Sequence, residues 1–170
     1  MKVLIVSDNH GSTSELRLLK EKYATEVDAF FHCGDSELSS TDEEVRGYYI
    51  VRGNCDYGVD FPVDITKDVQ DTRFYVTHGH LYGIKTSLQR ILYRAVEVEA
   101  NIVCFGHSHV RGVEMIDGIL FVNPGSILLP RLYKEKTYAL IEKDNEQMTV
   151  RFLNTEHEEI DYVTFSISQG

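Results

Sequence analysis

Side chains that bind divalent metal ions recur along the first two thirds of the sequence, each time just after a short apolar segment typical of a β-strand. In chain order they are Asp8, His10, Asp35, Asn54, His78, His80, His107 and His109. Histidines placed by chance would show no preference for such positions. Because the carboxyl ends of parallel strands form one crevice in an open α/β sheet, the pattern predicts that these residues meet in a single site. We interpret the remaining histidines, His32 and His157, as structural.

The donor types in this set favour borderline divalent ions. It offers imidazoles, two carboxylates and one carboxamide, without paired cysteines. Such donors suit Mn²⁺, Fe²⁺, Co²⁺, Ni²⁺ or Zn²⁺, whereas Mg²⁺ prefers more oxygen ligands and Cu⁺ more sulfur. A structural zinc site closes with about four ligands, so a larger set predicts two ions that share a carboxylate bridge and keep positions open for water or substrate. The predicted ligands are Asp8, His10, Asp35, Asn54, His78, His107 and His109.

The charge of the chain separates this site from the rest of the surface. The net charge is −10, and no run of Lys or Arg interrupts it, so long nucleic acid is not an expected partner. Two divalent ions would add about +4 and the carboxylates of Asp8 and Asp35 would remove about 2, which leaves a site of about +2. The expected partner is therefore a small phosphate ester.

Strands and helices alternate between these residues in the first part of the chain. The Ser12-x-x-Glu15 pattern is typical of a capping box and predicts a helix to about residue 25, and Ser40-x-x-Glu43 predicts a second, short helix. The order of strand, helix, strand, helix and strand predicts a parallel sheet. The expected strands are 3–7, 27–33 and 48–51.

The character of the sequence changes in the second half. Two strands are expected to meet at Gln70-Asp71, a helix is expected over 86–100, and Asp117-Gly118 is a dipeptide favoured in two-residue hairpin turns. The antiparallel pairs near the end of the chain are expected to build a second sheet packed on the first. The strands of this half are expected at 61–69, 72–77, 101–105, 111–116, 119–122, 137–143 and 147–153.

Composition and length favour one compact protein without a membrane anchor. The 170 residues suit a single domain over 1–170, and 42% hydrophobic with 26% charged residues is near the globular average. No apolar stretch approaches the roughly 18 residues that span a bilayer, and the start has no cleavage pattern of a signal peptide. Cys33, Cys55 and Cys104 form an odd set without C-x-x-C spacing, which favours a reducing, cytoplasmic location.

Five motifs in a fixed order resemble those of the calcineurin-like metallophosphoesterases. Each motif alone is weak, but their order along residues 3 to about 126 is specific. The short length and the sequence Gly-Asn-Cys-Asp are similar to a small single-domain branch of bacterial and archaeal phosphodiesterases. The resemblance implies an α/β (α+β) fold, a four-layer αββα sandwich with two central mixed β-sheets. The motifs are Asp8-x-His10, Gly34-Asp35, Gly53-Asn54, His78 and Gly106-His107-Ser108-His109, followed by Asn123-Pro124-Gly125-Ser126.

The resemblance also implies a role for each predicted ligand. In such sites the two ions lie about 3.5–4 Å apart, so that a bridging water loses its proton near neutral pH and attacks phosphorus in line, without a nucleophile from the protein. Mn²⁺ is the expected ion, with Ni²⁺, Co²⁺, Fe²⁺ and Zn²⁺ as alternatives. Asp35 is expected to bridge the ions, with Asp8, His10 and His109 on the first ion and Asn54, His78 and His107 on the second.

The residue after Asn54 departs from the wider family. Most members have a histidine there, usually credited with protonating the leaving group, whereas this chain has Cys55. A neutral thiol is a poor general acid, so Cys55 is either a weak substitute or a small packing residue, and His80 is a second candidate for the acid. Arg52, just before Gly53, is expected either to bind phosphate or to make a surface ion pair.

Other functions on the same chain make different demands on the sequence. A cysteine phosphatase needs Cys-x5-Arg, but Arg111 lies one residue too far from Cys104. The serious alternative is a non-catalytic metal-binding scaffold on the same fold, because fold alone does not establish activity. The complete ligand set favours the enzyme. The sequence leaves open the physiological substrate, the native metal and whether the chain forms a homo-oligomer.

Overall fold

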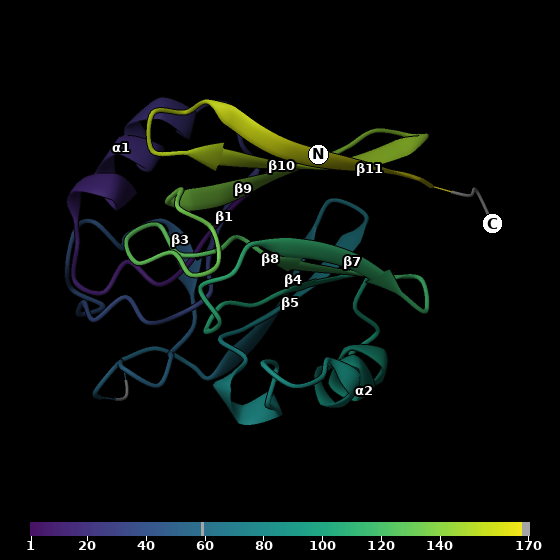
Figure 1. Cartoon of the computed structure of the whole chain (residues 1–170), viewed down its shortest axis with the longest axis horizontal. Coiled ribbons are helices and arrows are strands. Elements are labelled where there is room, and N and C mark those ends of the chain that lie inside the picture. The colour runs from purple at the N-terminus through teal and green to yellow at the C-terminus, as the bar shows by residue number, and fades with distance from the viewer. Residues whose placement is uncertain (59, 168–170) are drawn as a thin grey trace.

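The computed structural model describes residues 1–58 and 60–167 of the chain. A six-stranded sheet holds both ends of the described chain and has the order β11-β10-β9-β1-β2-β3 (Figure 1). The first three strands run parallel to one another, as the alternation of strand and helix predicts, and β9 to β11 add antiparallel strands at the other side. The bounds are β1 Lys2–Val6, β2 Ala29–His32, β3 Tyr48–Ile50, β9 Thr137–Lys143, β10 Gln147–Asn154 and β11 Glu159–Ser166.

The middle of the chain forms the second sheet. Its five strands have the order β4-β5-β6-β8-β7, with β5, β6 and β8 parallel and a strand running antiparallel at each edge. The hairpin between β7 and β8 turns at Asp117 and Gly118, both at positive φ, as predicted. The bounds are β4 Asp64–Val69, β5 Thr72–Thr77, β6 Ile102–Cys104, β7 Gly112–Ile116 and β8 Ile119–Asn123.

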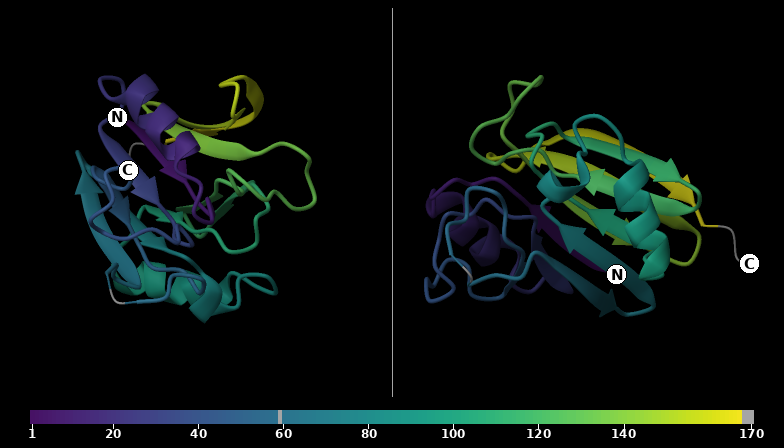
Figure 2. Two further views of the ribbon diagram at one scale, coloured as in Figure 1. Left: turned by 90° about the vertical axis from the view of Figure 1, so that its left-hand side faces the viewer. Right: turned by 90° about the horizontal axis from the view of Figure 1, so that it is seen from below.

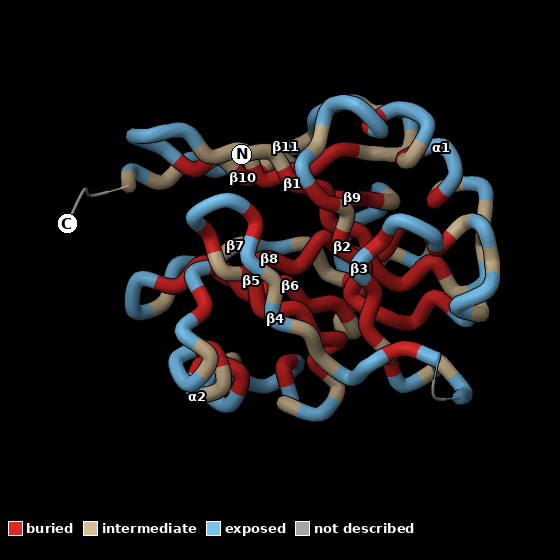
Figure 3. Tube along the Cα trace, turned by 180° about the vertical axis from the view of Figure 1, so that it is seen from behind, coloured by how far each residue is buried: buried red, intermediate tan, exposed pale blue. Residues whose placement is uncertain are grey.

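The two sheets pack face to face between two helices. Helix α1 (Ser14–Tyr23) covers the first sheet and helix α2 (Gln89–Glu97) covers the second, so the layers follow the order helix, sheet, sheet, helix (Figure 2). Apolar side chains from both sheets fill the space between them, where the rings of Phe31 and Phe74 lie 5.0 Å apart. The tube in Figure 3 shows the inner strands of the two sheets as the buried centre of the molecule. The predicted α/β sandwich with two mixed sheets is confirmed.

Two predictions about the elements were wrong. The strands at the end of the chain join the first sheet through the pairing of β9 with β1, and β4 to β8 form the second sheet instead. The segment at Ser40-x-x-Glu43 forms turns rather than a helix. Its backbone bonds reach the carbonyl three residues back, from Asp42 to Ser39 at 3.0 Å and from Arg46 to Glu43 at 3.2 Å, and not the fourth as in an α-helix. Two outcomes are smaller: β11 was not predicted, and α2 is shorter than the expected 86–100.

Among the described residues, no helix combines the length and the apolar character needed to cross a bilayer.

Candidate metal centre

The parallel strands of both sheets end at the same edge of the sandwich, and the predicted ligands meet there. Asp35 follows β2, Asn54 follows β3 and His78 follows β5. His78 Nε2 lies 3.1 Å from Asn54 Oδ1 and 3.3 Å from Asp35 Oδ2. The ring of His107, which follows β6, lies 5.1 Å from the ring of His78. Residues from four separated segments therefore form one half of the site.

The other half is built around Asp8, which follows β1. Asp8 Oδ1 lies 3.2 Å from His109 Nε2 and 3.9 Å from both His10 Nε2 and His78 Nε2. His10 Nε2 lies 3.3 Å from His109 Nε2. Because Asp8 contacts both halves, all seven predicted ligands belong to one cluster, although their roles as ligands remain a prediction.

Three of the four imidazoles among the predicted ligands are held so that Nε2 faces the centre of the cluster. His78 Nδ1 donates to the Cys33 carbonyl at 2.8 Å, and His109 Nδ1 donates to the Leu129 carbonyl at 2.7 Å. His10 Nδ1 donates to the Glu37 carboxylate at 3.0 Å. A histidine that uses Nδ1–H in this way presents a lone pair on Nε2, the arrangement found in histidines that bind metals.

Asp8 Oδ1 completes the case for a cation. Its partner oxygen Oδ2 accepts hydrogen bonds from Ser7 Oγ at 2.6 Å and from the His107 backbone N–H at 3.2 Å. Oδ1 is buried, and no group that the structure describes donates a hydrogen bond to it. A buried carboxylate oxygen that faces only nitrogen lone pairs is strongly destabilising without a positive charge. The residues present therefore fit bound metal ions.

The backbone at the ligands is strained. Five of the seven have a positive φ, in a region that residues other than glycine seldom occupy. Such conformations cost about 1–3 kcal/mol each and are concentrated at functional sites, where surrounding structure holds them. The φ angles are 58° at Asp8, 42° at His10, 55° at Asp35, 68° at His107 and 59° at His109.

Two glycines beside the ligands are required by close approach rather than by turn conformation. A Cβ at Gly53 would collide with the Asp35 carboxylate, and a Cβ at Gly106 would collide with the Ser7 hydroxyl and the Asp8 carboxylate. Neither glycine has a positive φ. Their role is to let the carboxylates of the cluster lie against the backbone of a neighbouring strand end.

Asp56 and Ser126 support the centre and were not singled out from the sequence. The Asp56 carboxylate accepts the backbone N–H groups of Asp35 at 2.8 Å and Gly53 at 2.7 Å. Ser126 Oγ donates to the Asp8 carbonyl at 2.8 Å and accepts the Leu129 backbone N–H at 2.7 Å. The motifs Gly-Asn-Cys-Asp and Asn-Pro-Gly-Ser contain these residues, and they were the available signal.

Burial and the carboxylates set the protonation of the cluster. Burial opposes charge on His78, but Asp35 and Asp8 outweigh it and raise the pKa of His78. In return His78 holds the pKa of Asp35 below its usual range despite burial. The Asp8 carboxylate raises the pKa of His109, whereas burial, with the nearby His78, lowers the pKa of His107 to about 4. The cluster thus draws positive charge toward its carboxylates.

The two candidates for the general acid lie beside the cluster. His80 begins the 3₁₀ helix η1 (His80–Tyr82), and its ring lies 5.3 Å from that of His78. Its Nδ1 is buried and has no hydrogen-bond partner among the described residues. The Cys55 backbone N–H donates to Asp35 Oδ1 at 2.8 Å. Burial, with the nearby Asp35 carboxylate, raises the pKa of the Cys55 thiol to about 11, so the thiol is neutral at pH 7.

Three other predictions from the sequence have clear outcomes. His32 Nε2 donates to Asn9 Oδ1 at 2.7 Å, and His157 Nδ1 lies 3.0 Å from the Tyr138 hydroxyl, so both have the structural contacts we expected. Arg52 makes no ion pair with any described residue. Instead its Nη1 donates to the Gly58 carbonyl at 2.8 Å.

Comparison with known sequences decides the family. The profile of the calcineurin-like phosphoesterase superfamily domain matches residues 1–146. The chain belongs to this superfamily. A relative from Bacillus subtilis, named probable metallophosphoesterase YsnB, is 44% identical over 161 residues, which is 95% of each chain. The phosphodiesterase YfcE of Escherichia coli K12 is 26% identical over 180 residues, covering 91% of this chain and 93% of its own.

Solved structures agree with this assignment. A predicted phosphoesterase from Streptococcus pneumoniae TIGR4 superimposes with a TM-score of 0.94 at 36% identity, covering 98% of this chain and 97% of its own. Vps29 from Chaetomium thermophilum superimposes with a TM-score of 0.77 at 16% identity, covering 98% and 97%. The second likeness concerns the fold alone. The calcineurin-like fold therefore occurs in proteins with names as different as phosphoesterase and Vps29.

Proposed function

We propose that this calcineurin-like protein is a hydrolase of small phosphodiesters that uses two divalent metal ions, with Mn²⁺ as the favoured ion. The observation that carries the proposal is the buried Asp8 Oδ1, which faces the Nε2 atoms of His10, His78 and His109 and accepts no hydrogen bond from the described residues. The name of YfcE, a phosphodiesterase, supports the choice of substrate class.

The seven predicted ligands fit two ions better than one. Asp8, His10 and His109 form one group with ligand atoms within 4.8 Å of one another, and Asp8, Asp35 and His78 form another. We assign Asp35 as the bridge and place Asn54 and His107 with His78. Two bound ions would supply Lewis acidity toward the phosphoryl oxygens and would lower the pKa of water.

The residues of the chain contribute position and charge. Asp56 and Ser126 fix the backbone on which Asp35 and Asp8 lie, so the carboxylates need not reorganise during the reaction. His80 and Cys55 lie beside the cluster, and either could hold a proton for a departing group. The thiol of Cys55 is the weaker donor because its pKa is raised to about 11.

The test is hydrolysis of bis(p-nitrophenyl) phosphate by the purified protein, before and after treatment with EDTA and after Mn²⁺ is restored. We expect release of p-nitrophenol that is lost with EDTA and returns with Mn²⁺. Metal content measured on the same samples separates an enzyme from a scaffold, because a scaffold would bind metal without turnover. Metal-bound protein that leaves every phosphodiester intact would overturn the proposal.

A further inference from the structure

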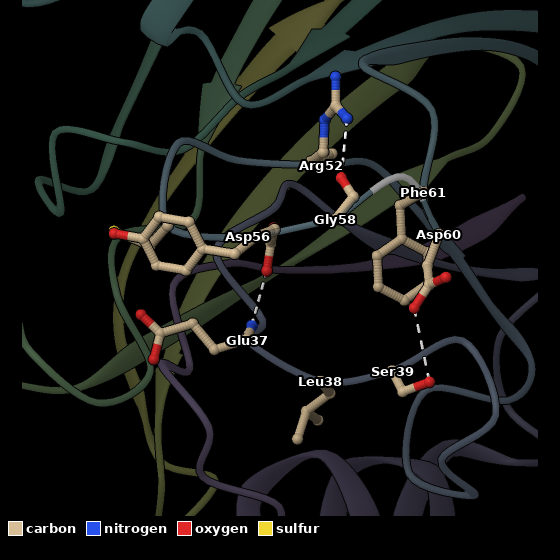
Figure 4. Close-up of a pocket in the computed structure, with 10 residues that line it drawn as sticks. Glu37, Leu38, Ser39, Arg52, Asp56, Gly58, Asp60 and Phe61 are labelled. Atoms are coloured by element: carbon tan, nitrogen blue, oxygen red, sulfur yellow. Dashed lines mark hydrogen bonds between the residues drawn. The ribbon is translucent and has the colours of Figure 1, made fainter.

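A cavity of about 340 Å³ opens beside the metal centre, between residues 37–39 and the segment that follows β3 (Figure 4). Three of its lining residues also contact the centre, one of them being Asp56, which accepts the Asp35 backbone N–H. The Cys55 thiol lies within 4.8 Å of ligand atoms of His10 and Asp35, and the Glu37 carboxylate holds the His10 ring at 3.0 Å. A substrate with its phosphate at the centre would therefore reach this cavity with one of its ester groups.

The cavity carries more negative than positive charge. Three carboxylates line it, from Glu37, Asp56 and Asp60, against the single guanidinium of Arg52. The Arg52 guanidinium binds the backbone, since its Nη1 donates to the Gly58 carbonyl at 2.8 Å. Asp60 is exposed, and its one polar contact in the described chain is the hydroxyl of Ser39 at 3.5 Å. The metal centre is suited to a phosphate group, whereas the cavity directly beside it would repel a second phosphate group.

Apolar groups make up the rest of the lining. Phe61 is buried, Leu38 is partly exposed, and Tyr57 is 97% exposed. Tyr57 and Phe61 offer aromatic surface to an organic group, and the volume lies in the range of small-molecule sites. A ring system can pack on these side chains while its polar atoms reach Asp60 or Ser39.

We propose that this cavity selects the substrate: it holds one ester group of the phosphodiester, and this group is an organic alcohol that is uncharged or cationic and bears no phosphate. The inference rests on the proposed function and adds the substrate class to it. Coulomb repulsion from Glu37 and Asp60 disfavours a phosphorylated group, whereas a nucleoside or an amino alcohol meets no such penalty.

Two matched substrates test the selection. One is the p-nitrophenyl ester of thymidine 5′-monophosphate, and the other is the same compound with a phosphate on its 3′-hydroxyl. With the Mn²⁺-loaded protein we expect kcat/KM for the first to exceed that for the second by about tenfold or more, and the ratio to fall at high ionic strength. Equal values for the two esters would overturn the proposal.

A charge reversal assigns the selection to this cavity. We expect Asp60→Lys to reduce the ratio between the two esters by about tenfold, because it changes the local charge by 2. Glu21→Lys on the exposed face of α1 makes the same change in net charge away from the cavity and should leave the ratio as in the wild type. A ratio that moves equally in both variants would show that net charge alone selects the substrate.

Binding to the metal-free protein keeps this inference separate from the proposed function. In ligand-observed NMR with EDTA-treated protein, we expect saturation transfer to thymidine in the wild type and its loss in Tyr57→Ala. Thymidine binding without any turnover would refute the proposed function and leave the cavity as a site for such groups. Two results would refute selection by the cavity. One is turnover with the same kcat/KM for both esters, and the other is thymidine binding that does not depend on Tyr57.

Discussion

The metal centre has a buried side and an exposed side, and the two are held in different ways. On the buried side, the polar atoms that face away from the cluster bind backbone groups or buried hydroxyls. On the exposed side, His10 depends on the partly exposed carboxylate of Glu37, and Asn54 is itself exposed. The buried side comprises Asp8, Asp35, His78 and His109, and the exposed side comprises His10, Asn54, Cys55 and His107.

This difference separates two tasks. Side chains that are shielded from solvent can hold a fixed geometry, and their charges act strongly on an ion because the local dielectric constant is low. Groups at the surface can give way to a substrate, and the cavity beside Cys55 and Glu37 opens on this side. The comparison predicts that changes on the buried side abolish metal binding, whereas changes on the exposed side alter rates and selectivity.

Removal of the ions should have the largest effect. EDTA should abolish hydrolysis of bis(p-nitrophenyl) phosphate, and Mn²⁺, followed by Co²⁺ or Ni²⁺, should restore it better than Mg²⁺ because the cluster is rich in imidazole. The measurement is kcat/KM after reconstitution with each ion. Full reactivation by Mg²⁺ alone would contradict the predicted ligand set.

Loss of the carboxylate that we propose as the bridge should come next. Asp35→Asn should reduce kcat/KM and metal affinity by more than about 100-fold, the upper range for residues that merely support ligands. The pKa of Asp35 is held low by His78, so the carboxylate is fully charged at neutral pH and its replacement removes a whole charge. Asp68→Asn, in an exposed ion pair with Arg73, is the matched control. An Asp35→Asn protein with two bound ions and normal turnover would end the assignment.

The sequence predicted the centre better than the connections of the sheets. Asp8, Asp35 and His78 could be placed because each follows an apolar segment, and parallel strands bring such positions together. The sheet joined by β9 could not be predicted, because Tyr138 to Leu140 are buried on both faces and suit the middle of either sheet. Strand β11 lies at an edge with mostly exposed residues, so its apolar pattern is weak.

The supporting residues were missed for a different reason. Asp56, Ser126 and Glu37 act through hydrogen bonds to backbone groups or to a ligand ring, and an isolated Asp, Ser or Glu in a loop is more commonly a turn residue or a solvated surface residue. The motifs around Asp56 and Ser126 were a signal in the sequence, but only three-dimensional proximity shows which groups these side chains bind. Ser126 supports Asp8 on the buried side and Glu37 supports His10 on the exposed side, so replacing each one tests whether the two sides differ.

Replacing one support from each side should give unequal losses. Ser126→Ala removes the buried hydrogen bond to the Asp8 carbonyl and the acceptor of two partly buried backbone N–H groups, so we expect about 1–3 kcal/mol lower stability and about 10–100-fold weaker metal binding. Glu37→Gln on the exposed side keeps an acceptor for His10 and should weaken binding by less than about tenfold. Chelator competition and thermal unfolding measure both.

The control for this pair is Glu21→Gln, an exposed change on α1. Equal losses in metal affinity for Ser126→Ala and Glu37→Gln would contradict the division of the centre into a buried side and an exposed side. A large loss for Glu37→Gln alone would make His10 the dominant ligand.

Restoring a general acid should give the smallest change, confined to substrates with poor leaving groups. The Cys55 thiol has its pKa raised to about 11, so it does not titrate near neutral pH and donates a proton weakly. A well-placed acid contributes about 10²–10⁴-fold. On this solvent-accessible side we expect Cys55→His to raise kcat/KM by only about tenfold for phosphomonoesters and alkyl esters, with no change for activated aryl diesters.

The pH profile of the same variant gives the mechanism. A histidine donates its proton only below its pKa, which is about 6.5 without perturbation, so the gain should be present at low pH and disappear as the pH rises through that value. Cys55→Ser, which keeps a small neutral side chain, is the control. It should show neither the gain in kcat/KM nor its decline as the pH rises. A Cys55→His protein with normal metal content and unchanged rates across leaving groups of different pKa would remove position 55 from proton transfer and leave His80 as the candidate acid.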